Sequence, residues 1–249
     1  MYDDIKNKRV LVVGASKGIG RQLCHAIDQL GGHVQAASRD IATLSNGLSH
    51  TGIPNDQLFS CDIQQPGSIL NLVQNLSPVD AVCITAGATK LVPKHLIKRH
   101  IIDSQLSVNL SGPIDLISTM LRLKKVKQRA SIITTSASGR YNGVKATVPY
   151  VAAKNALVAV SRSLASELSS QKIRINSVSF DYVSTEMTGA IISHFETNKA
   201  DDLDGIVGVS PVENTVIPYL YLISEASKWM TGQVLSADSG RRLSRVVYG

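Results

Sequence analysis

Aromatic side chains are scarce in this sequence of 249 residues, because Phe, Trp and Tyr together make up 4% of it. A surface that stacks on nucleic-acid bases needs such rings interleaved with basic residues, so no nucleic-acid partner is expected. No apolar run approaches the ~20 residues of a membrane-spanning helix. The first residues, Met-Tyr-Asp-Asp-Ile-Lys, lack the hydrophobic core of a signal peptide. We therefore expect a protein of the cytoplasm without a membrane partner.

Cysteine is also rare, and its pattern excludes two kinds of site. Cys24, Cys61 and Cys83 are an odd number and lack the spacing of metal ligands. Cys61 and Cys83 fall near the ends of predicted strands, where buried free thiols are common. We expect free thiols in a reducing compartment, and no metal site.

The overall composition is that of an ordered globular protein, with 43% hydrophobic and 18% charged residues. No linker rich in Pro, Gly or Ser and no repeat interrupts it, so we predict one domain over residues 1–249. The formal net charge is +7, and cations gather at Lys94, Lys98 and Arg99 and again over residues 122–129. Solvated helix ends explain such clusters, because cations favour helix C-termini. An acidic substrate carrier or an anionic cofactor is the alternative explanation.

Short apolar runs alternate with longer stretches of helical periodicity. Predicted strands cover residues 9–13, 33–37, 57–61, 81–85, 131–136, 174–178 and 233–236, and predicted helices cover 19–30, 41–48, 66–76, 98–121, 151–169 and 212–224. This alternation predicts an α/β fold, a single-domain Rossmann-type doubly wound parallel sheet of about seven strands with helices on both faces. Such sheets bind ligands at the carboxyl ends of their strands.

A glycine-rich turn, Gly14-Ala-Ser-Lys-Gly-Ile-Gly20, follows the first predicted strand. Glycines between a strand and a helix let backbone N–H groups approach a diphosphate at the helix N-terminus. The spacing Gly-x-x-x-Gly-x-Gly differs from the commoner Gly-x-Gly-x-x-Gly, but its physical demands are the same. The turn predicts a dinucleotide site made by Gly14, Ser16, Lys17, Gly18, Ile19 and Gly20.

The second predicted strand ends without the acidic residue that an NAD site places against the ribose 2′-hydroxyl. It ends in Ala-Ala-Ser38-Arg39 instead, which supplies a hydroxyl and a guanidinium. These groups suit the 2′-phosphate of NADP(H), and Lys17 adds a second cation. We interpret Asp40 as the cap of the next helix rather than a ribose ligand. The predicted cofactor is NADP(H).

Tyr150 and Lys154 lie four residues apart in Pro-Tyr-Val-Ala-Ala-Lys, so a helix places them on one face. A phenol beside a bound nicotinamide is a proton donor or acceptor, and its ordinary pKa near 10 calls for help at neutral pH. We expect Lys154 to give that help by stabilising the phenolate. The spacing alone is common, and a surface tyrosine and lysine are the alternative. Its combination with the glycine turn is specific.

Together these motifs resemble the short-chain dehydrogenase/reductase family over nearly the whole length, and within it the 3-oxoacyl-acyl carrier protein reductases. The resemblance implies that Asp62 and Ile63 contact the adenine, and that Val183 and Thr185 contact the carboxamide. It implies further cofactor contacts from Ala86 and Gly87 after the fourth strand, and from Tyr150 and Lys154 themselves.

The same resemblance implies two further members of the catalytic set. Ser136 matches the serine that hydrogen-bonds the substrate oxygen, although Ser138 competes for this role. Asn109, in Val-Asn-Leu, matches the asparagine that anchors a water next to Lys154; a helix-interior polar residue without a role is the alternative. The implied catalytic residues are therefore Tyr150, Lys154, Ser136 and Asn109.

Three segments depart from the family pattern. Val13 replaces a threonine, Ile84-Thr85 replaces two asparagines, and Phe180-Asp181 replaces a Pro-Gly that shapes the nicotinamide pocket. The Asp181 carboxylate either faces solvent or discriminates among substrates. These departures leave an alternative open, namely an NADP-binding relative with weak or lost catalysis and a binding or regulatory role.

We therefore expect an NADP-dependent oxidoreductase that reversibly reduces a ketone or 3-oxoacyl group, free or carrier-bound, to a secondary alcohol. By family likeness, residues 185–208 form the substrate loop. The resemblance also implies a homo-oligomer, a tetramer or dimer, assembled through the helix that carries Tyr150 and through the C-terminal strand.

Overall fold

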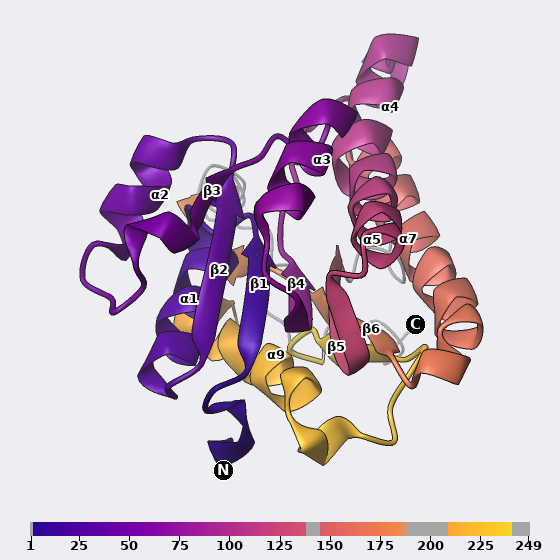
Figure 1. Ribbon diagram of the computed structural model, residues 1–249. Coiled ribbons are helices and arrows are strands. Elements are labelled where there is room, and N and C mark those ends of the chain that lie inside the picture. The colour runs from indigo at the N-terminus through magenta and orange to yellow at the C-terminus, as the bar shows by residue number, and fades with distance from the viewer. Residues whose placement is uncertain (1, 138–144, 187, 189–208, 241–249) are drawn as a thin grey trace.

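The computed structural model describes residues 2–137, 145–186, 188 and 209–240. Among these, seven parallel strands form one sheet in the order β3-β2-β1-β4-β5-β6-β9 (Figure 1). The strands are β1 (Arg9–Val13), β2 (His33–Ser38), β3 (Leu58–Ser60), β4 (Val79–Ile84), β5 (Val126–Ala137), β6 (Arg174–Phe180) and β9 (Val234–Ala237). The predicted doubly wound parallel fold is confirmed.

Helices cover both faces of the sheet (Figure 1). One face is covered by α1 (Gly18–Gln29), α2 (Ile41–Leu48) and α9 (Val216–Ile223), and the other by α3 (Pro66–Asn75), α5 (Gly112–Arg122) and α7 (Val148–Glu167). In β1, Val10 and Val12 pack into the first layer, whereas Leu11 and Val13 pack into the second. Because both faces are buried, the strand is a continuous apolar run rather than an alternating one.

The side on which successive strands join the sheet changes between β1 and β4, and a crevice lies at the carboxyl ends of these two strands. The chain runs outward from β1 to β2 and β3, then crosses back to β4 on the other side of β1. Hydrogen bonds from Gly14 N to Ala37 O (2.8 Å) and from Ala86 N to Val13 O (2.8 Å) fix the turns there. Ligands of open parallel sheets bind at such a point.

The single helix predicted over residues 98–121 is interrupted. The structure has α4 (Arg99–Leu106), a π-helical turn over Ser107–Ser111, and then α5. Pro113 has no N–H to donate to the Asn109 carbonyl, its partner in a regular α-helix, and Gly112 N instead bonds Ser107 O. The apolar periodicity continues through this turn, which is why the sequence pattern did not reveal it.

Strand β5 begins five residues earlier than predicted, at Val126. This earlier start shows where the basic residues 122–129 lie in the fold. They lie at the amino end of β5, whereas Ser136 lies at its carboxyl end. Lys125 Nζ donates to Leu76 O (2.5 Å) at the end of α3, and Lys127 Nζ pairs with Asp80 (2.9 Å). Lys125 thus agrees with the explanation that the cations lie at helix C-termini, because it contacts the C-terminal end of α3. Within one chain, these cations do not reach the crevice.

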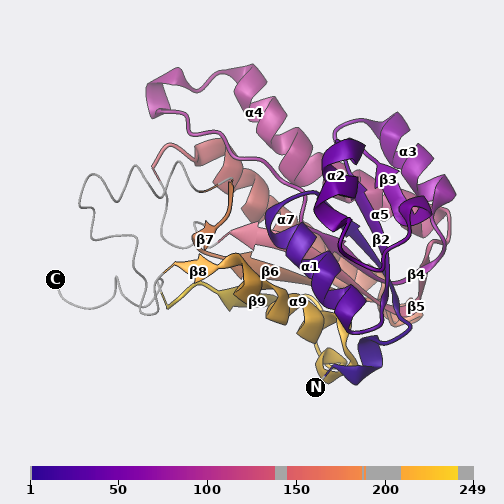
Figure 2. The ribbon, with the colours of Figure 1, turned by 90° about the vertical axis from the view of Figure 1, so that its left-hand side faces the viewer.

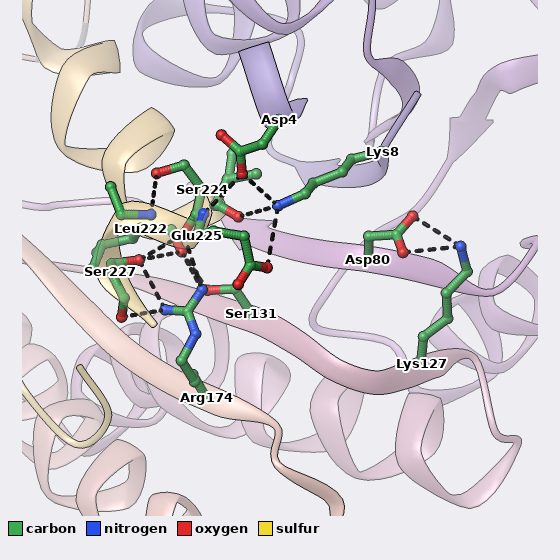
Figure 3. A network of polar contacts seen from close by, with 12 residues as sticks. Asp4, Lys8, Asp80, Lys127, Ser131, Arg174, Leu222, Ser224, Glu225 and Ser227 are labelled. Atoms are coloured by element: carbon green, nitrogen blue, oxygen red, sulfur yellow. Dashed lines mark hydrogen bonds and ion pairs between the residues drawn. The ribbon is translucent and has the colours of Figure 1, made fainter. Parts of the chain in front are cut away.

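A polar network at the amino end of the sheet joins distant parts of the chain (Figure 3). Arg174 donates to Leu222 O (3.0 Å) and to Ser227 Oγ (2.9 Å), while Lys8 pairs with Asp4 (2.9 Å) and Glu225 (3.7 Å). Partial burial of the Arg174 guanidinium lowers its pKa. These contacts hold the first residues against the segment after α9, on the side away from the crevice.

Cys24, Cys61 and Cys83 are buried and free, as expected. Burial raises the pKa of the Cys61 thiol to about 11, so it is protonated at neutral pH. No helix in the described ranges is long and apolar enough to cross a membrane.

Candidate active site

A cleft of about 500 Å³ lies at the carboxyl ends of the strands and gathers most of the predicted site residues. Its lining comes from the glycine turn, the ends of β2, β4 and β5, the start of α7 and the short strand β7 (Val183–Ser184). The predicted residues that line it are Gly14, Ser16, Lys17, Gly18, Ile19, Gly20, Ser38, Arg39, Ile63, Ala86, Gly87, Ser136, Tyr150, Lys154, Val183 and Thr185.

The glycine turn is packed so tightly that side chains are excluded from it. Gly14 has φ of +94°, and a Cβ on it would lie 2.5 Å from Ala86 N. A Cβ on Gly20 would lie 2.2 Å from Gly14 O. Helix α1 begins here with Lys17 as its N-cap, which makes no side-chain capping bond within the described chain. The first N–H groups of a helix lack intrahelical partners, so this end suits an anion.

The end of β2 presents the cation Arg39, and the neighbouring carboxylate of Asp40 already accepts hydrogen bonds from Thr43. Asp40 caps α2 as predicted, because it accepts a hydrogen bond from Thr43 N (3.0 Å). The hydrogen bonds from Thr43 lower the pKa of Asp40. Ser38 Oγ donates to Asp40 O (2.9 Å), and Arg39 is exposed beside it.

Tyr150 and Lys154 occupy the first two turns of α7, with the ammonium beneath the phenol ring. Lys154 is 3% exposed, and its Nζ donates to Thr135 O (2.9 Å) and lies 5.9 Å from the Tyr150 ring centroid. Burial lowers the pKa of Lys154 to about 8. Burial raises the pKa of Tyr150 to about 12. In the free chain desolvation prevails, and Tyr150 carries its proton at neutral pH. The expected stabilisation of a phenolate by Lys154 stays a prediction.

Ser136 and Asn109 both lie next to Lys154, but only Ser136 lines the cleft. Ser136 Oγ is buried and donates to Lys154 O (3.3 Å). Its competitor Ser138 lies outside the described residues. Asn109 is fully buried in the π-helical turn; its Nδ2 donates to Ala88 O (2.8 Å), and its Oδ1 accepts from Ala88 N (3.2 Å).

Gly87 is what allows Asn109 and Lys154 to come close together. A Cβ on Gly87 would lie 2.9 Å from Asn109 Oδ1 and 3.2 Å from Lys154 Nζ. The absence of a side chain therefore makes room for both polar groups behind the cleft. A polar π-helical turn in such a place is common at functional sites.

Asp62 does not line the cleft, although its neighbours Cys61 and Ile63 do. Its carboxylate accepts a hydrogen bond from Gln64 N (3.0 Å). The implied adenine contact by its side chain therefore stays a prediction.

Thr135, Glu186 and Thr188 also line the cleft and were not predicted as site residues. Phe180 and Asp181, which depart from the family pattern, line it as well. Thr135 Oγ1 bonds Ile84 O (2.7 Å) and the buried hydroxyl of Tyr219 (2.6 Å), and the Tyr219 ring stacks on Phe180 with centroids 5.9 Å apart. Phe180 thus has a packing role at the place of the family's proline. The carbonyl of Thr135 that accepts the hydrogen bond from Lys154 is a backbone group, so the type of residue at this position could not have predicted the contact.

Known proteins resemble this chain in sequence. A family model described as "Enoyl-(Acyl carrier protein) reductase" matches residues 14–242. The chain belongs to the short-chain dehydrogenase/reductase family. The L-xylulose reductase of Caenorhabditis elegans is 31% identical over 246 residues, covering 95% of this chain and 96% of that protein. A 3-oxoacyl-acyl-carrier-protein reductase of Chlamydia trachomatis is 25% identical over 248 residues, covering 94% and 97%.

The fold of the family is equally plain in three dimensions. The structure of a short-chain dehydrogenase/reductase of the glucose/ribitol dehydrogenase type from Brucella melitensis superposes with a TM-score of 0.87 at 21% identity, covering 95% of this chain and 97% of that one. As a member of this family, the protein is an oxidoreductase that acts on CH–OH or C=O groups with a nicotinamide dinucleotide.

Proposed function

We propose that this short-chain dehydrogenase/reductase uses NADPH to reduce a ketone or a 3-oxoacyl group to a secondary alcohol. The observation that carries the proposal is the buried Lys154 ammonium, which lies 5.9 Å from the ring centroid of a protonated Tyr150 at the end of the glycine-turn cleft. A protonated phenol is a proton donor, as carbonyl reduction requires. Reversal, by oxidation of the alcohol, uses the same groups.

The residues of the cleft fit a phosphorylated dinucleotide. The uncapped start of α1 would hold the diphosphate, and the exposed Arg39 with Lys17 would hold the 2′-phosphate. Asp40 does not stand in for a ribose acid, because Thr43 already engages its carboxylate. By family likeness, Ile63, Ala86, Gly87, Val183 and Thr185 would complete the contacts. This donor set supports NADP rather than NAD.

The chemical step divides between the cofactor and the chain. The residues of the cleft would hold NADPH, which would supply the hydride for the carbonyl carbon. Tyr150 donates its phenolic proton to the oxygen of that carbonyl as negative charge develops there. The buried Lys154 ammonium stabilises the tyrosinate that is left. Ser136, whose hydroxyl donates to Lys154 O in the free chain, would turn this hydroxyl to the same substrate oxygen. Asn109 holds the loop after β4 through its two hydrogen bonds to Ala88.

The substrate is proposed as a class of carbonyl compound. The relatives include an L-xylulose reductase at 31% identity and a 3-oxoacyl-acyl-carrier-protein reductase at 25% identity, which supports a ketone with polar or acyl surroundings. Support for an acidic carrier comes from the segment that follows Ala88, because Ala88 itself lines the cleft. Val92 N in this segment donates to Ala146 O (2.7 Å), four residues before Tyr150, and Lys94 and Lys98 are exposed there.

We also propose that residues 1–249 form one NADP-binding domain with its substrate loop at 185–208. Most of that loop lies outside the described residues. A cytoplasmic location and a homo-oligomeric state remain part of the proposal.

A second candidate function is dinucleotide binding without turnover, and Asp181 favours it. This residue lines the cleft where the family has a small glycine next to the nicotinamide. An added carboxylate there opposes the negative charge that develops during carbonyl reduction.

The decisive experiment measures NADPH oxidation with a panel of ketones that includes L-xylulose and a 3-oxoacyl thioester, together with dissociation constants for NADPH and NADH. The proposal predicts turnover of at least one ketone and tighter binding of NADPH. Binding without turnover across the panel would support the second candidate, and tighter binding of NADH would refute the cofactor assignment.

A further inference from the structure

Two walls of the cleft are joined by an ion pair between Lys17 and Glu186. Lys17 belongs to the glycine turn, and Glu186 follows β7 on the opposite wall; both line the cleft. Lys17 Nζ lies 2.7 Å from Glu186 Oε2. The side chain of Thr185 also approaches the backbone of Gly18 here, since a Cβ on Gly18 would lie 3.4 Å from Thr185 Cγ2. The walls therefore meet at residues 17–18 and 185–186.

The carboxylate of Glu186 is presented by a hydrogen-bonded turn. Strand β7 pairs with β8 (Ser210–Pro211), beside the main sheet (Figure 2). Thr185 N donates to Thr188 Oγ1 (3.1 Å), and Thr188 Oγ1 donates to Val183 O. These bonds close the turn around Glu186 and place it opposite the glycine turn.

The ammonium of Lys17 lowers the pKa of two carboxylates, those of Glu186 and Asp40. Its hydrogen bond, and then its charge, lower the pKa of Glu186. For Asp40 the hydrogen bonds of Thr43 are the main cause of a lowered pKa, and the charge of Lys17 adds to them. Asp40 adjoins Arg39, where the 2′-phosphate is proposed to bind. Lys17 is therefore within electrostatic reach of both the Glu186 carboxylate and the phosphate position.

We propose that Glu186 competes with the 2′-phosphate of NADP for Lys17 and thereby reduces the preference of the protein for NADP over NAD. The inference rests on the proposed function, in which Lys17 and Arg39 hold this phosphate. NADP must exchange the carboxylate partner of Lys17 for its phosphate, whereas NAD leaves the ion pair intact. Glu186 thus weakens the binding of NADP selectively. It also links phosphate recognition at one end of the cleft to the segment after β7 at the other.

The size of the effect follows from exposure. The side chains of Lys17 and Glu186 are 57% and 59% exposed, so solvent screens their attraction. Exposed ion pairs of this kind change an equilibrium by about twofold to fivefold. Added salt weakens such pairs further, so the effect shrinks as ionic strength rises.

The test compares the wild type with Glu186→Gln by fluorescence titration with NADPH and NADH. We expect Glu186→Gln to tighten NADPH by about twofold to fivefold while leaving NADH unchanged. In a Lys17→Gln background, Glu186→Gln should have no effect on NADPH, because the competition needs both partners. Glu167→Gln, at the exposed far end of α7, is the matched control with the same charge change.

The inference is overturned by looser NADPH binding in Glu186→Gln, by an equal change for both cofactors, or by the same gain in the Lys17→Gln background. Failure of the proposed function has a different signature. If the proposed function is wrong, the wild type itself binds NADH more tightly than NADPH, regardless of the affinities of Glu186→Gln. A wild type that prefers NADPH, with no shift in Glu186→Gln, refutes the inference alone.

Discussion

At the scale of single residues, burial decides the protonation of the candidate catalytic pair. Lys154 and Tyr150 are both shifted toward their neutral forms, with pKa values of about 8 and about 12. The free protein therefore holds a protonated phenol at neutral pH, ready to donate. The sequence predicted the pair by its spacing. It carried no signal for the backbone carbonyl of Thr135, which determines where the ammonium lies.

The lowered pKa of Lys154 predicts opposite pH trends for activity and stability. Above pH 8 the folded protein loses the Lys154 ammonium, so kcat/KM for ketone reduction should fall by about tenfold per pH unit. Between about pH 8 and pH 10.5 the unfolded chain holds this proton more tightly, so the contribution of Lys154 to stability rises. Rate profiles and urea melts at matched pH measure the two. A falling rate that tracks falling stability would contradict the account.

Gly87→Ala tests the packing of Asn109 against Lys154. The new Cβ would lie 2.9 Å from Asn109 Oδ1 and 3.2 Å from Lys154 Nζ, so both groups must shift. We expect kcat to fall by about tenfold or more, since catalytic groups tolerate little displacement. Gly67→Ala is the control, because a Cβ there meets nothing within 4 Å. Equal activity of both variants would show that the position of these groups does not matter.

At the scale of elements, the predicted helices and strands agree with the structure where apolar burial alone determines the sequence pattern. The β1 residues are buried on both faces, and the apolar run showed it. The segment over residues 98–121 must both pack an apolar face and break its helix before Pro113. Only the apolar packing produces a periodic pattern in the sequence. The start of β5 was missed because charged residues at its exposed amino end resemble a loop.

The segment after β4 predicts a dependence on substrate charge. Lys94→Glu with Lys98→Glu should reduce kcat/KM for an acidic or carrier-bound 3-oxoacyl substrate about tenfold, while a small neutral ketone is unaffected. The control pair is Lys6→Glu with Lys228→Glu, two exposed positions near the amino end of the sheet. Steady-state kinetics with both substrates measures the effect. A loss for the neutral ketone, or for the control pair, would remove the charge explanation.

At the scale of the whole molecule, the sheet ends on an open strand. β9 is the terminal strand in the described sheet, and its four residues are only partly buried in the single chain. The nearby Trp229 is 91% exposed. Unpaired strand edges and exposed apolar groups favour association. The fold was predictable from alternation, whereas assembly rests on family likeness and these exposed groups.

We expect light scattering to give a dimer or tetramer of the 26.7 kDa chain. Trp229→Lys should weaken the assembly without unfolding the subunit, because Trp229 makes little contact within one chain. A monomeric mass for the wild type at micromolar concentration would contradict the expectation.

The most direct test of the central claim, that the phenol of Tyr150 supplies the proton in carbonyl reduction, is a comparison of Tyr150→Phe with the wild type. The account predicts an unchanged dissociation constant for NADPH and a loss of about 10²–10⁴-fold in kcat for ketone reduction. Undiminished reduction by Tyr150→Phe would contradict it.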